Sequence, residues 1–142
     1  MIGGYSLSLV LIGRDEEDVI GRCLDSFKDV VDEIVYVDTG SVDNTVKIAK
    51  RYTNKIYYFK WIDDFSAARN FSFSKCTGDF LLWCDCDDVL RPEDVKKIKT
   101  LDLSDKEIII CNYEYSHDEF DNSTCTVPRE RIIKRSLGLK WE

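Results

Sequence analysis

The chain has 142 residues, of which 44% are hydrophobic, and a formal net charge of −7 at pH 7. This length fits a single domain. The acidic balance argues against a nucleic-acid partner, which would require a basic face. No apolar run reaches the roughly 18 residues of a membrane span, and no secretory signal opens the sequence. We therefore expect a cytoplasmic protein, free or peripheral at the inner face of the membrane.

Strand-like and helix-like patterns alternate over the first hundred residues. Apolar runs typical of buried strands cover residues 6–12, 33–37, 55–59 and 79–84. Helical patterns cover residues 16–30, 44–52 and 66–75, with Asp43 or Asn44 and then Ser66 as caps, and a further helix opens at Pro92. This alternation predicts an α/β fold, a mostly parallel sheet flanked by helices.

The pattern changes after residue 105. Residues 106–116 and 123–134 are strand-like and are separated by a polar stretch, which predicts a C-terminal antiparallel hairpin added to the sheet. We therefore treat 1–105 as the βα region and 106–142 as a second region of the same domain.

The six cysteines are predicted to be free thiols. They are scattered, and several lie inside apolar runs, as small buried hydrophobes do in a reducing compartment. Cys84 and Cys86 could form half of a zinc site, but no second pair has ligand spacing, and His117 is the only histidine. Cys111 and Cys125 are expected to be near neighbours across the hairpin, the one pair that air oxidation could join.

Acidic residues follow three of the four predicted parallel strands, at Asp15-Glu16-Glu17, at Asp38 and at Asp85-Cys86-Asp87-Asp88. Ligands of parallel α/β sheets bind beyond the carboxyl ends of the strands. Three carboxylates within four residues repel one another unless a cation or protonation relieves them. Oxygen ligands without imidazole suit Mg²⁺ or Mn²⁺. We therefore expect Asp85 and Asp87 to bind one of these ions.

Structural roles remain open for several of these residues. Asp87 and Asp88 could simply cap the turn that follows their strand. The segment Asp38-Thr39-Gly40-Ser41 is also a good β-to-α turn, with Gly40 at positive φ. Arg69 could be a surface helix residue. Trp61 and Phe65 are interpreted as packing residues, and Glu16 and Glu17 as a solvated first helical turn.

Four motifs in this order resemble family 2 glycosyltransferases, which have the GT-A (Rossmann-like) fold. They are Arg14-Asp15-Glu16-Glu17, Asp38-Thr39-Gly40-Ser41, Trp61 to Asn70 (WIDDFSAARN) and Asp85-Cys86-Asp87-Asp88. The family subgroup usually has Lys-Asn where this chain has Arg14-Asp15, a change that could alter contacts with the base. The resemblance covers residues 6–95.

The resemblance implies a metal-dependent, hexosyltransferase-like enzyme that uses a nucleotide-diphosphate sugar, usually UDP-linked. The positions implied to bind the nucleotide sugar are Ile12, Arg14, Asp38, Thr39, Arg69 and Asp85. Asp38 and Thr39 would contact the base and ribose, and Arg69 the phosphates. Asp85 and Asp87 would hold Mn²⁺ or Mg²⁺, a Lewis acid that stabilises the leaving diphosphate. The acceptor, whether glycan, lipid or peptide, is not identified.

The resemblance also implies that the acceptor-side region begins where this sequence stops. Residues 128–142 match the approach to it, so we expect the general base beyond Glu142 and an incomplete active site. Apolar surface on residues 106–135 would then be exposed, and a homodimer is one way to cover it.

Three other classes of protein also gather acidic residues at the ends of strands. A haloacid-dehalogenase-type phosphatase would use Asp85-x-Asp87 but needs a later acidic pair. A receiver-like signalling domain would need an acid after the third strand. A nucleotidyltransferase would want a glycine-rich basic loop after the first strand, and Gly13-Arg14 alone is too little.

Overall fold

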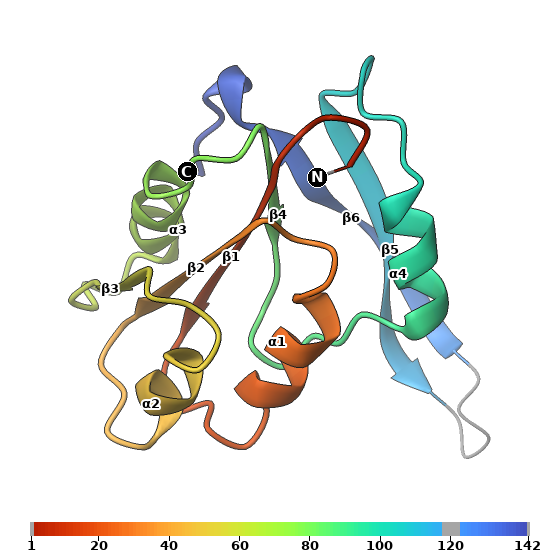
Figure 1. Cartoon of the computed structure of the whole chain (residues 1–142). Coiled ribbons are helices and arrows are strands. Elements are labelled where there is room, and N and C mark those ends of the chain that lie inside the picture. The colour runs from red at the N-terminus through yellow and green to blue at the C-terminus, as the bar shows by residue number, and fades with distance from the viewer. Residues whose placement is uncertain (1, 118–122, 142) are drawn as a thin grey trace.

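The computed structural model describes residues 2–117 and 123–141, with side chains outside 112–128. The strands are β1 (Leu7–Gly13), β2 (Glu33–Asp38), β3 (Ile56–Tyr58), β4 (Phe80–Trp83), β5 (Ile108–His117) and β6 (Ser123–Lys134). The helices are α1 (Ile20–Phe27), α2 (Thr45–Ala49), α3 (Phe65–Ser74) and α4 (Pro92–Lys99), with a short 3-10 helix, η1 (Arg135–Leu137). The predicted alternation of strands and helices is confirmed (Figure 1).

These six strands form one sheet in the order β3-β2-β1-β4-β6-β5. The four N-terminal strands are parallel, whereas β6 runs antiparallel to both β4 and β5. The hairpin prediction is therefore confirmed, and its second strand lies inside the sheet, between β4 and β5 (Figure 1). This mixed sheet flanked by helices is the mostly parallel α/β arrangement that the sequence predicts.

Alternate residues of the central strands point to opposite faces of the sheet. Leu9 and Leu11 of β1 belong to a core that includes buried residues of α1, α2 and α4, whereas Val10 packs on the other face with Cys76 and Trp83. Figure 1 shows α1, α2 and α4 on one side and α3 on the other. The buried strands are apolar on both faces because helices or the C-terminal segment cover both.

Helix boundaries differ from the sequence-based predictions. α1 begins at Ile20 rather than at residue 16 and ends at Phe27, so Glu16 and Glu17 lie in a preceding turn. α3 is capped by Asp64, whose carboxylate accepts a hydrogen bond from the Ala67 amide at 3.0 Å, and not by Ser66. An aspartate at this position satisfies an otherwise unpaired amide of the first turn.

The described part of the hairpin carries the exposed apolar surface that was expected. Ile108 and Ile110 of β5 are 43% and 65% exposed. The expectation about Cys111 and Cys125 was wrong, because Cys111 lies opposite Arg129 and Cys125 opposite Ser116 in the β5–β6 register. Cys111 lies six positions before the end of β5 but Cys125 only two positions after the start of β6, so regular antiparallel pairing does not place them opposite each other.

The described cysteines Cys23, Cys76, Cys84, Cys86 and Cys111 are all free thiols. Among the described residues, no helix has the length and apolar character required to cross a membrane.

Candidate functional site

The turn after β2 is held by Asp38. Its carboxylate, 3% exposed, accepts hydrogen bonds from the amides of Gly40 (3.0 Å) and Ser41 (2.8 Å) and from the Ser41 hydroxyl (2.6 Å). The Tyr36 hydroxyl donates a fourth bond at 2.7 Å. Burial and this contact raise the pKa of Tyr36. Gly40 has φ 125°, as the turn interpretation predicts. The Asp38 side chain is thus largely occupied in shaping its own loop.

Gly13, the last residue of β1, is where the turns after β2 and β4 meet. A Cβ at this position would lie 2.7 Å from the Cys86 sulfur and 2.9 Å from the Tyr36 hydroxyl, so only glycine fits. The Gly13 carbonyl accepts a bond from the Thr39 amide at 3.1 Å. The structure therefore brings the Asp38 and Asp85–Asp88 turns together at one end of the sheet.

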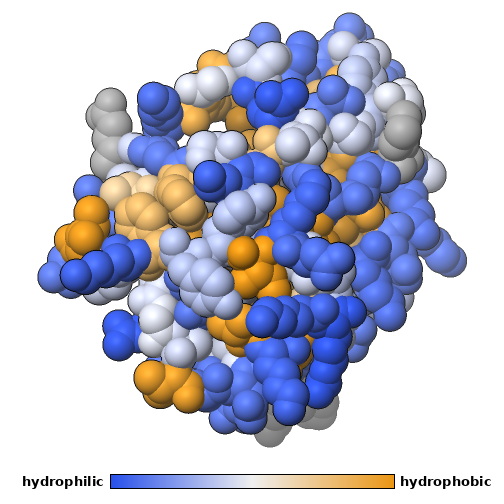
Figure 2. Space-filling view, turned by 60° about the vertical axis from the view of Figure 1, so that its left-hand side comes forward, coloured by the Kyte–Doolittle hydropathy of each residue, from blue (hydrophilic) through white to orange (hydrophobic). Residues whose placement is uncertain are grey.

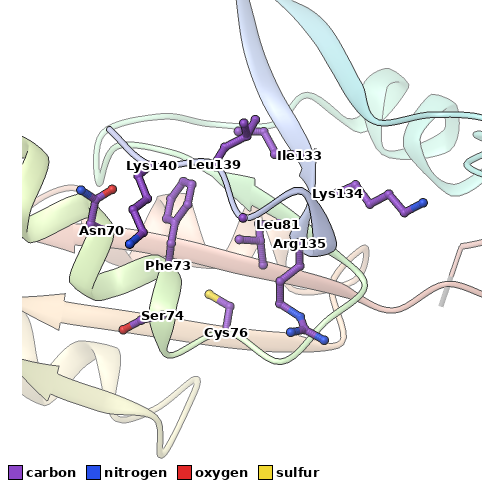
Figure 3. Close-up of a pocket in the computed structure, with 11 residues that line it drawn as sticks. Asn70, Phe73, Ser74, Cys76, Leu81, Ile133, Lys134, Arg135, Leu139 and Lys140 are labelled. Atoms are coloured by element: carbon purple, nitrogen blue, oxygen red, sulfur yellow. The ribbon is translucent and has the colours of Figure 1, made fainter. Parts of the chain in front are cut away.

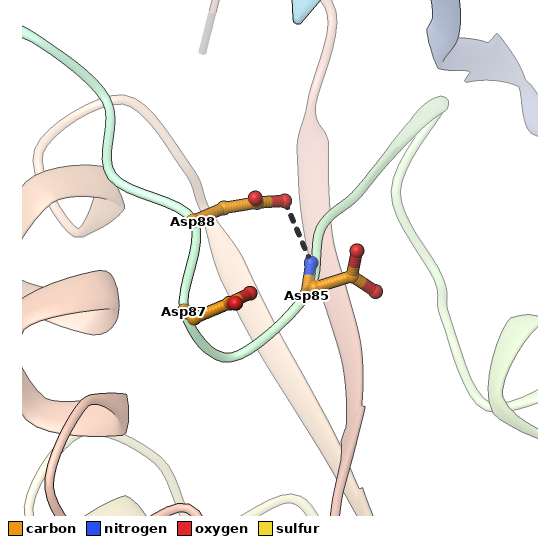
Figure 4. Close-up of side chains that lie close together, drawn as sticks. All are labelled: Asp85, Asp87 and Asp88. Carbon is orange, nitrogen blue, oxygen red and sulfur yellow. Dashed lines mark hydrogen bonds between the residues drawn. The ribbon is translucent and has the colours of Figure 1, made fainter. Parts of the chain in front are cut away.

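The turn after β4 gathers three carboxylates. Asp85, Asp87 and Asp88 each offer one oxygen, and these oxygens lie within 4.8 Å of one another (Figure 4). Asp88 accepts a bond from the Asp85 amide at 2.9 Å and pairs with Arg131 at 3.1 Å. Asp87 is exposed and accepts no hydrogen bond from any residue that the structure describes. The capping role considered for both residues therefore falls to Asp88 alone.

This arrangement fits a divalent cation. Asp88 is neutralised by Arg131, which leaves Asp85 and Asp87 as oxygen donors side by side at the mouth of the turn. Two carboxylates with open space beside them match the preference of Mg²⁺ and Mn²⁺ for oxygen ligands, water and phosphate. The two residues predicted to bind metal are therefore suitably placed.

Arg69, on α3, reaches the same turn. Its guanidinium lies 3.4 Å from the Asp85 carboxylate and 4.3 Å from the centre of the Trp83 ring. Arg131 stacks on Trp83 at 4.1 Å, so Trp83 lies against two guanidinium groups. The Arg69 side chain is only 13% exposed. Burial lowers the pKa of Arg69, and the positive charge of Arg131 lowers it further. The nearby Asp85 carboxylate has the opposite effect but does not outweigh them. The surface-residue interpretation of Arg69 was wrong.

The loop after β1 is joined to the loop after β2 by hydrogen bonds in both directions. The amides of Asp15 and Glu16 donate to the hydroxyls of Ser41 (2.9 Å) and Thr45 (2.8 Å). In return, the Glu17 carboxylate accepts from the Asn44 amide at 3.1 Å. The interpretation of Glu16 and Glu17 as a solvated helical turn was therefore wrong: they belong to a loop tied to its neighbour.

Glu16 faces the acidic turn from this loop. Burial raises its pKa, and the charges of Asp87, Asp43, Asp85 and Asp15 raise it further. A carboxylate with a raised pKa among like charges is a frequent feature of functional sites.

The remaining predicted positions surround these groups. Ile12 is half-buried, and its carbonyl lies 3.5 Å from the Cys86 sulfur. Thr39 is buried, and its hydroxyl faces the Gly13 carbonyl at 3.4 Å. Arg14 is exposed on the loop after β1. All of them lie near the carboxyl ends of the parallel strands.

The sequence pattern indicated no role for Arg131 or Trp141, and for Asp88 only that of a turn cap. Asp88 was visible in the acidic motif, but its pairing with Arg131 spans 43 positions. Phe65 was interpreted as a packing residue, yet it is 52% exposed, while its ring lies 5.0 Å from the Arg69 guanidinium. Figure 2, turned toward the β3 and α3 side, shows apolar surface set among polar groups there.

A cavity of about 230 Å³ lies away from this cluster, between α3 and the segment after β6. Phe73, Leu81 and Ile133 give it an apolar wall, and Arg135 and Lys140 lie at its rim (Figure 3). It contains none of the acidic residues of the carboxyl edge.

Residues 8–139 match the sequence profile described as glycosyl transferase family 2. The chain therefore belongs to glycosyltransferase family 2. Among curated proteins, it is 48% identical over 84 residues to a TPR repeat-containing protein of Synechococcus elongatus, covering 59% of this chain and 21% of that protein. It is 33% identical over 106 residues to the glycosyltransferase SunS of Bacillus subtilis, covering 69% of this chain and 25% of that protein. The chain thus spans about a fifth to a quarter of these relatives.

Two solved structures have a similar fold. The first is Staphylococcus aureus TarS 1–349 in complex with UDP, with a TM-score of 0.53 and 25% identity over 65% of this chain and 30% of that one. The second is Mycobacterium tuberculosis glucosyl-3-phosphoglycerate synthase in complex with Mn²⁺ and UDP-glucose. Its TM-score is also 0.53, with 25% identity over 61% of this chain and 34% of that one.

Proposed function

We propose that this chain binds the donor of a glycosyltransferase, a nucleotide-diphosphate sugar that is UDP-linked, together with Mn²⁺ or Mg²⁺. The observation that carries the proposal is the exposed Asp87, which has no hydrogen-bond partner among the described residues, beside Asp85, with Arg69 3.4 Å from Asp85. A cation held by Asp85 and Asp87 would relieve the repulsion between these carboxylates and a diphosphate. The UDP and Mn²⁺ complexes of similar structures support the choice of ligand.

In this proposal the residues serve three parts of the bound donor: the cation, the diphosphate, and the base with its ribose. Asp85 and Asp87 hold the cation, and Arg69 contacts the diphosphate. Ile12, Arg14, Asp38 and Thr39 surround the base and ribose. Because Asp38 already accepts four hydrogen bonds, its direct contact with a ligand would require the Ser41 hydroxyl to turn away.

The metal would act as a Lewis acid on the leaving diphosphate when bound. The bond between the anomeric carbon and the diphosphate oxygen breaks, and the acceptor oxygen or sulfur forms the new bond and loses its proton to a base. Arg69 stabilises the negative charge that develops on the diphosphate, from a site where burial strengthens the interaction. The acceptor is proposed to be a glycan, lipid or peptide.

A cytoplasmic location is also proposed, because the described cysteines are free thiols and four of them are buried. A homodimer through β5 would cover Ile108 and Ile110. The phosphatase and nucleotidyltransferase alternatives are not favoured, because the family match includes the acidic turn on which they relied.

The test is calorimetric titration of the chain with UDP, in Mn²⁺ and again in chelator. UDP is expected to bind in the presence of Mn²⁺. In chelator, its affinity should fall by more than about tenfold, which corresponds to about 1.4 kcal/mol of binding free energy. Asp87→Asn should give weak binding in both conditions. Asp29→Asn removes the same charge from an exposed site beyond α1 and should match the wild type. Equal UDP affinity with and without chelator would count against the proposal.

A further inference from the structure

Arg69 is enclosed by aromatic rings from three parts of the chain. Its guanidinium carbon lies 5.0 Å from the ring centre of Phe65, 4.3 Å from that of Trp83 and 5.1 Å from that of Trp141. All three distances fall within the range of cation–π attraction. The rings therefore restrict an otherwise flexible side chain to the side of the acidic turn.

Trp141 reaches this position because its backbone is tied to α3. The Asn70 side chain donates to the Trp141 carbonyl at 2.9 Å and accepts from the Trp141 amide at 2.7 Å. These two bonds use both ends of the Asn70 amide, across 71 positions of sequence. Figure 3 shows Lys140, the neighbour of Trp141 in sequence, next to Asn70.

The ring of Trp141 also packs within the aromatic cluster. It meets Trp83 edge-on at a centroid distance of 5.3 Å and Phe73 at 6.2 Å. Trp83 is fixed in turn, because its indole nitrogen donates to the Glu130 carbonyl and its ring stacks on Arg131. Trp141 thus closes an ordered wall behind Arg69.

We propose that Asn70 and Trp141 are positioning residues that fix Arg69 beside Asp85 so that it can receive the diphosphate of the donor. The inference rests on the proposed function and extends it to the segment after β6. In this proposal Trp141 affects the donor through Arg69 and does not contact the nucleoside. Its loss should therefore weaken recognition of the diphosphate and leave recognition of the nucleoside unchanged.

The expected size follows from the cost of ordering one side chain. Immobilising a long, flexible side chain on binding costs roughly 0.5–1.5 kcal/mol, which corresponds to about two- to tenfold in affinity. When the aromatic rings hold Arg69 in place before the donor binds, this cost is avoided. When the loss of Trp141 releases Arg69, binding of the donor must order its side chain and the cost returns.

The experiment measures dissociation constants of UDP and of uridine in Mn²⁺, by calorimetry with competition for the weaker ligand. Trp141→Leu and Asn70→Ala should each weaken UDP roughly two- to tenfold and leave uridine unchanged. Trp141→Phe, which keeps an aromatic face, should recover most of the loss. Leu139→Ala changes a 49% exposed neighbour in the same segment and should match the wild type. Urea denaturation of each variant shows whether it is folded.

The outcomes separate the two proposals. A wild-type chain that does not bind UDP in Mn²⁺ overturns the proposed function, and this inference with it. Wild-type binding with unchanged UDP affinity in Trp141→Leu and Asn70→Ala overturns the inference alone. Equal loss of UDP and uridine affinity also overturns it, since that would indicate a general structural role. If Trp141→Leu does not fold, the UDP and uridine affinities of Asn70→Ala, compared with those of Trp141→Phe, decide by the same criteria.

Discussion

Acidic side chains lie at both ends of the parallel strands, but the two ends differ in how many of their carboxylates accept hydrogen bonds from the chain. At the amino end, Asp32, Glu33 and Asp79 each accept hydrogen bonds from neighbouring amides or hydroxyls. At the carboxyl end, Asp38 and Asp88 are similarly engaged, whereas Asp87 has no such partner among the described residues. An acidic residue at a strand end therefore indicates a ligand site only when the rest of the chain leaves its carboxylate without hydrogen-bond partners.

Asp38→Ala should give the largest change in stability. It removes a buried acceptor and leaves the Tyr36 hydroxyl and two amides without their partner. We expect the free energy of unfolding to fall by about 4 kcal/mol, measured by urea denaturation. Asp29→Ala, at an exposed site, is the control. A loss below about 1 kcal/mol would mean that the chain does not depend on Asp38 to shape this loop.

Glu33→Gln tests the amino end. Burial opposes ionisation of Glu33, but hydrogen bonds from Lys55, Thr77 and Ser8 outweigh it and lower its pKa from 4.5 to about 2. The ionised side chain therefore stabilises the fold above pH 4.5, and this contribution is lost as the pH falls toward 2. We expect this pKa shift to contribute about 3 kcal/mol to the free energy of unfolding, since the Glu33 side chain is only 7% exposed.

The measurement is urea denaturation at pH 7, 4.5 and 2.5. The wild type should lose its advantage over Glu33→Gln as the pH falls, whereas Glu93→Gln, on the exposed start of α4, should follow the wild type. A constant difference between the wild type and Glu33→Gln across this range would contradict the assignment.

Asp87→Asn tests the carboxyl end with Mn²⁺ alone. Mn²⁺ at 100 times its dissociation constant should stabilise the wild type by about 2.7 kcal/mol, seen as a rise in melting temperature. Asp87→Asn should melt at the wild-type temperature or slightly above it without metal, because a like charge is removed, and should not respond to the same Mn²⁺ concentration. An equal response in both proteins would show that Asp87 does not bind the ion.

Glu17→Ala should have the smallest effect. Its exposed carboxylate accepts one amide bond, from Asn44 at 3.1 Å. We expect a loss of about 0.5–1 kcal/mol in the free energy of unfolding. Asp18→Ala, the exposed neighbour, should change less. If the two variants are equal, the bond between the loops after β1 and β2 contributes nothing measurable at Glu17.

The regular elements could be predicted because each signal is local. The apolar runs of β1 and β4 and the proline at the start of α4 identify their elements without reference to the rest of the chain. The predicted start of α1 was wrong by four positions because two hydroxyls from another part of the chain hold the preceding residues out of the helix. They belong to Ser41, on the loop after β2, and to Thr45, the first residue of α2. Such a partner leaves no trace in the local pattern.

The candidate site divides in the same way. Asp85 and Asp87 stand out in sequence because three acids follow an apolar strand. The partnership of Asp88 with Arg131 and that of Asn70 with Trp141 span 43 and 71 positions, so spacing alone cannot reveal them. The family resemblance implied the candidate residues, and the packing around Trp83 indicates how Arg69 is held among them.

The place of β6 between β4 and β5 has a consequence for the order of folding. β1 to β4 can pair as soon as they leave the ribosome, but β5 is then synthesised before the only described strand that it pairs with. Until β6 arrives, the open side of β4 is an unpaired strand edge, which invites association with other chains. We therefore expect docking of the hairpin to be the late and slow step of folding, and the step at which a chaperone has most to protect.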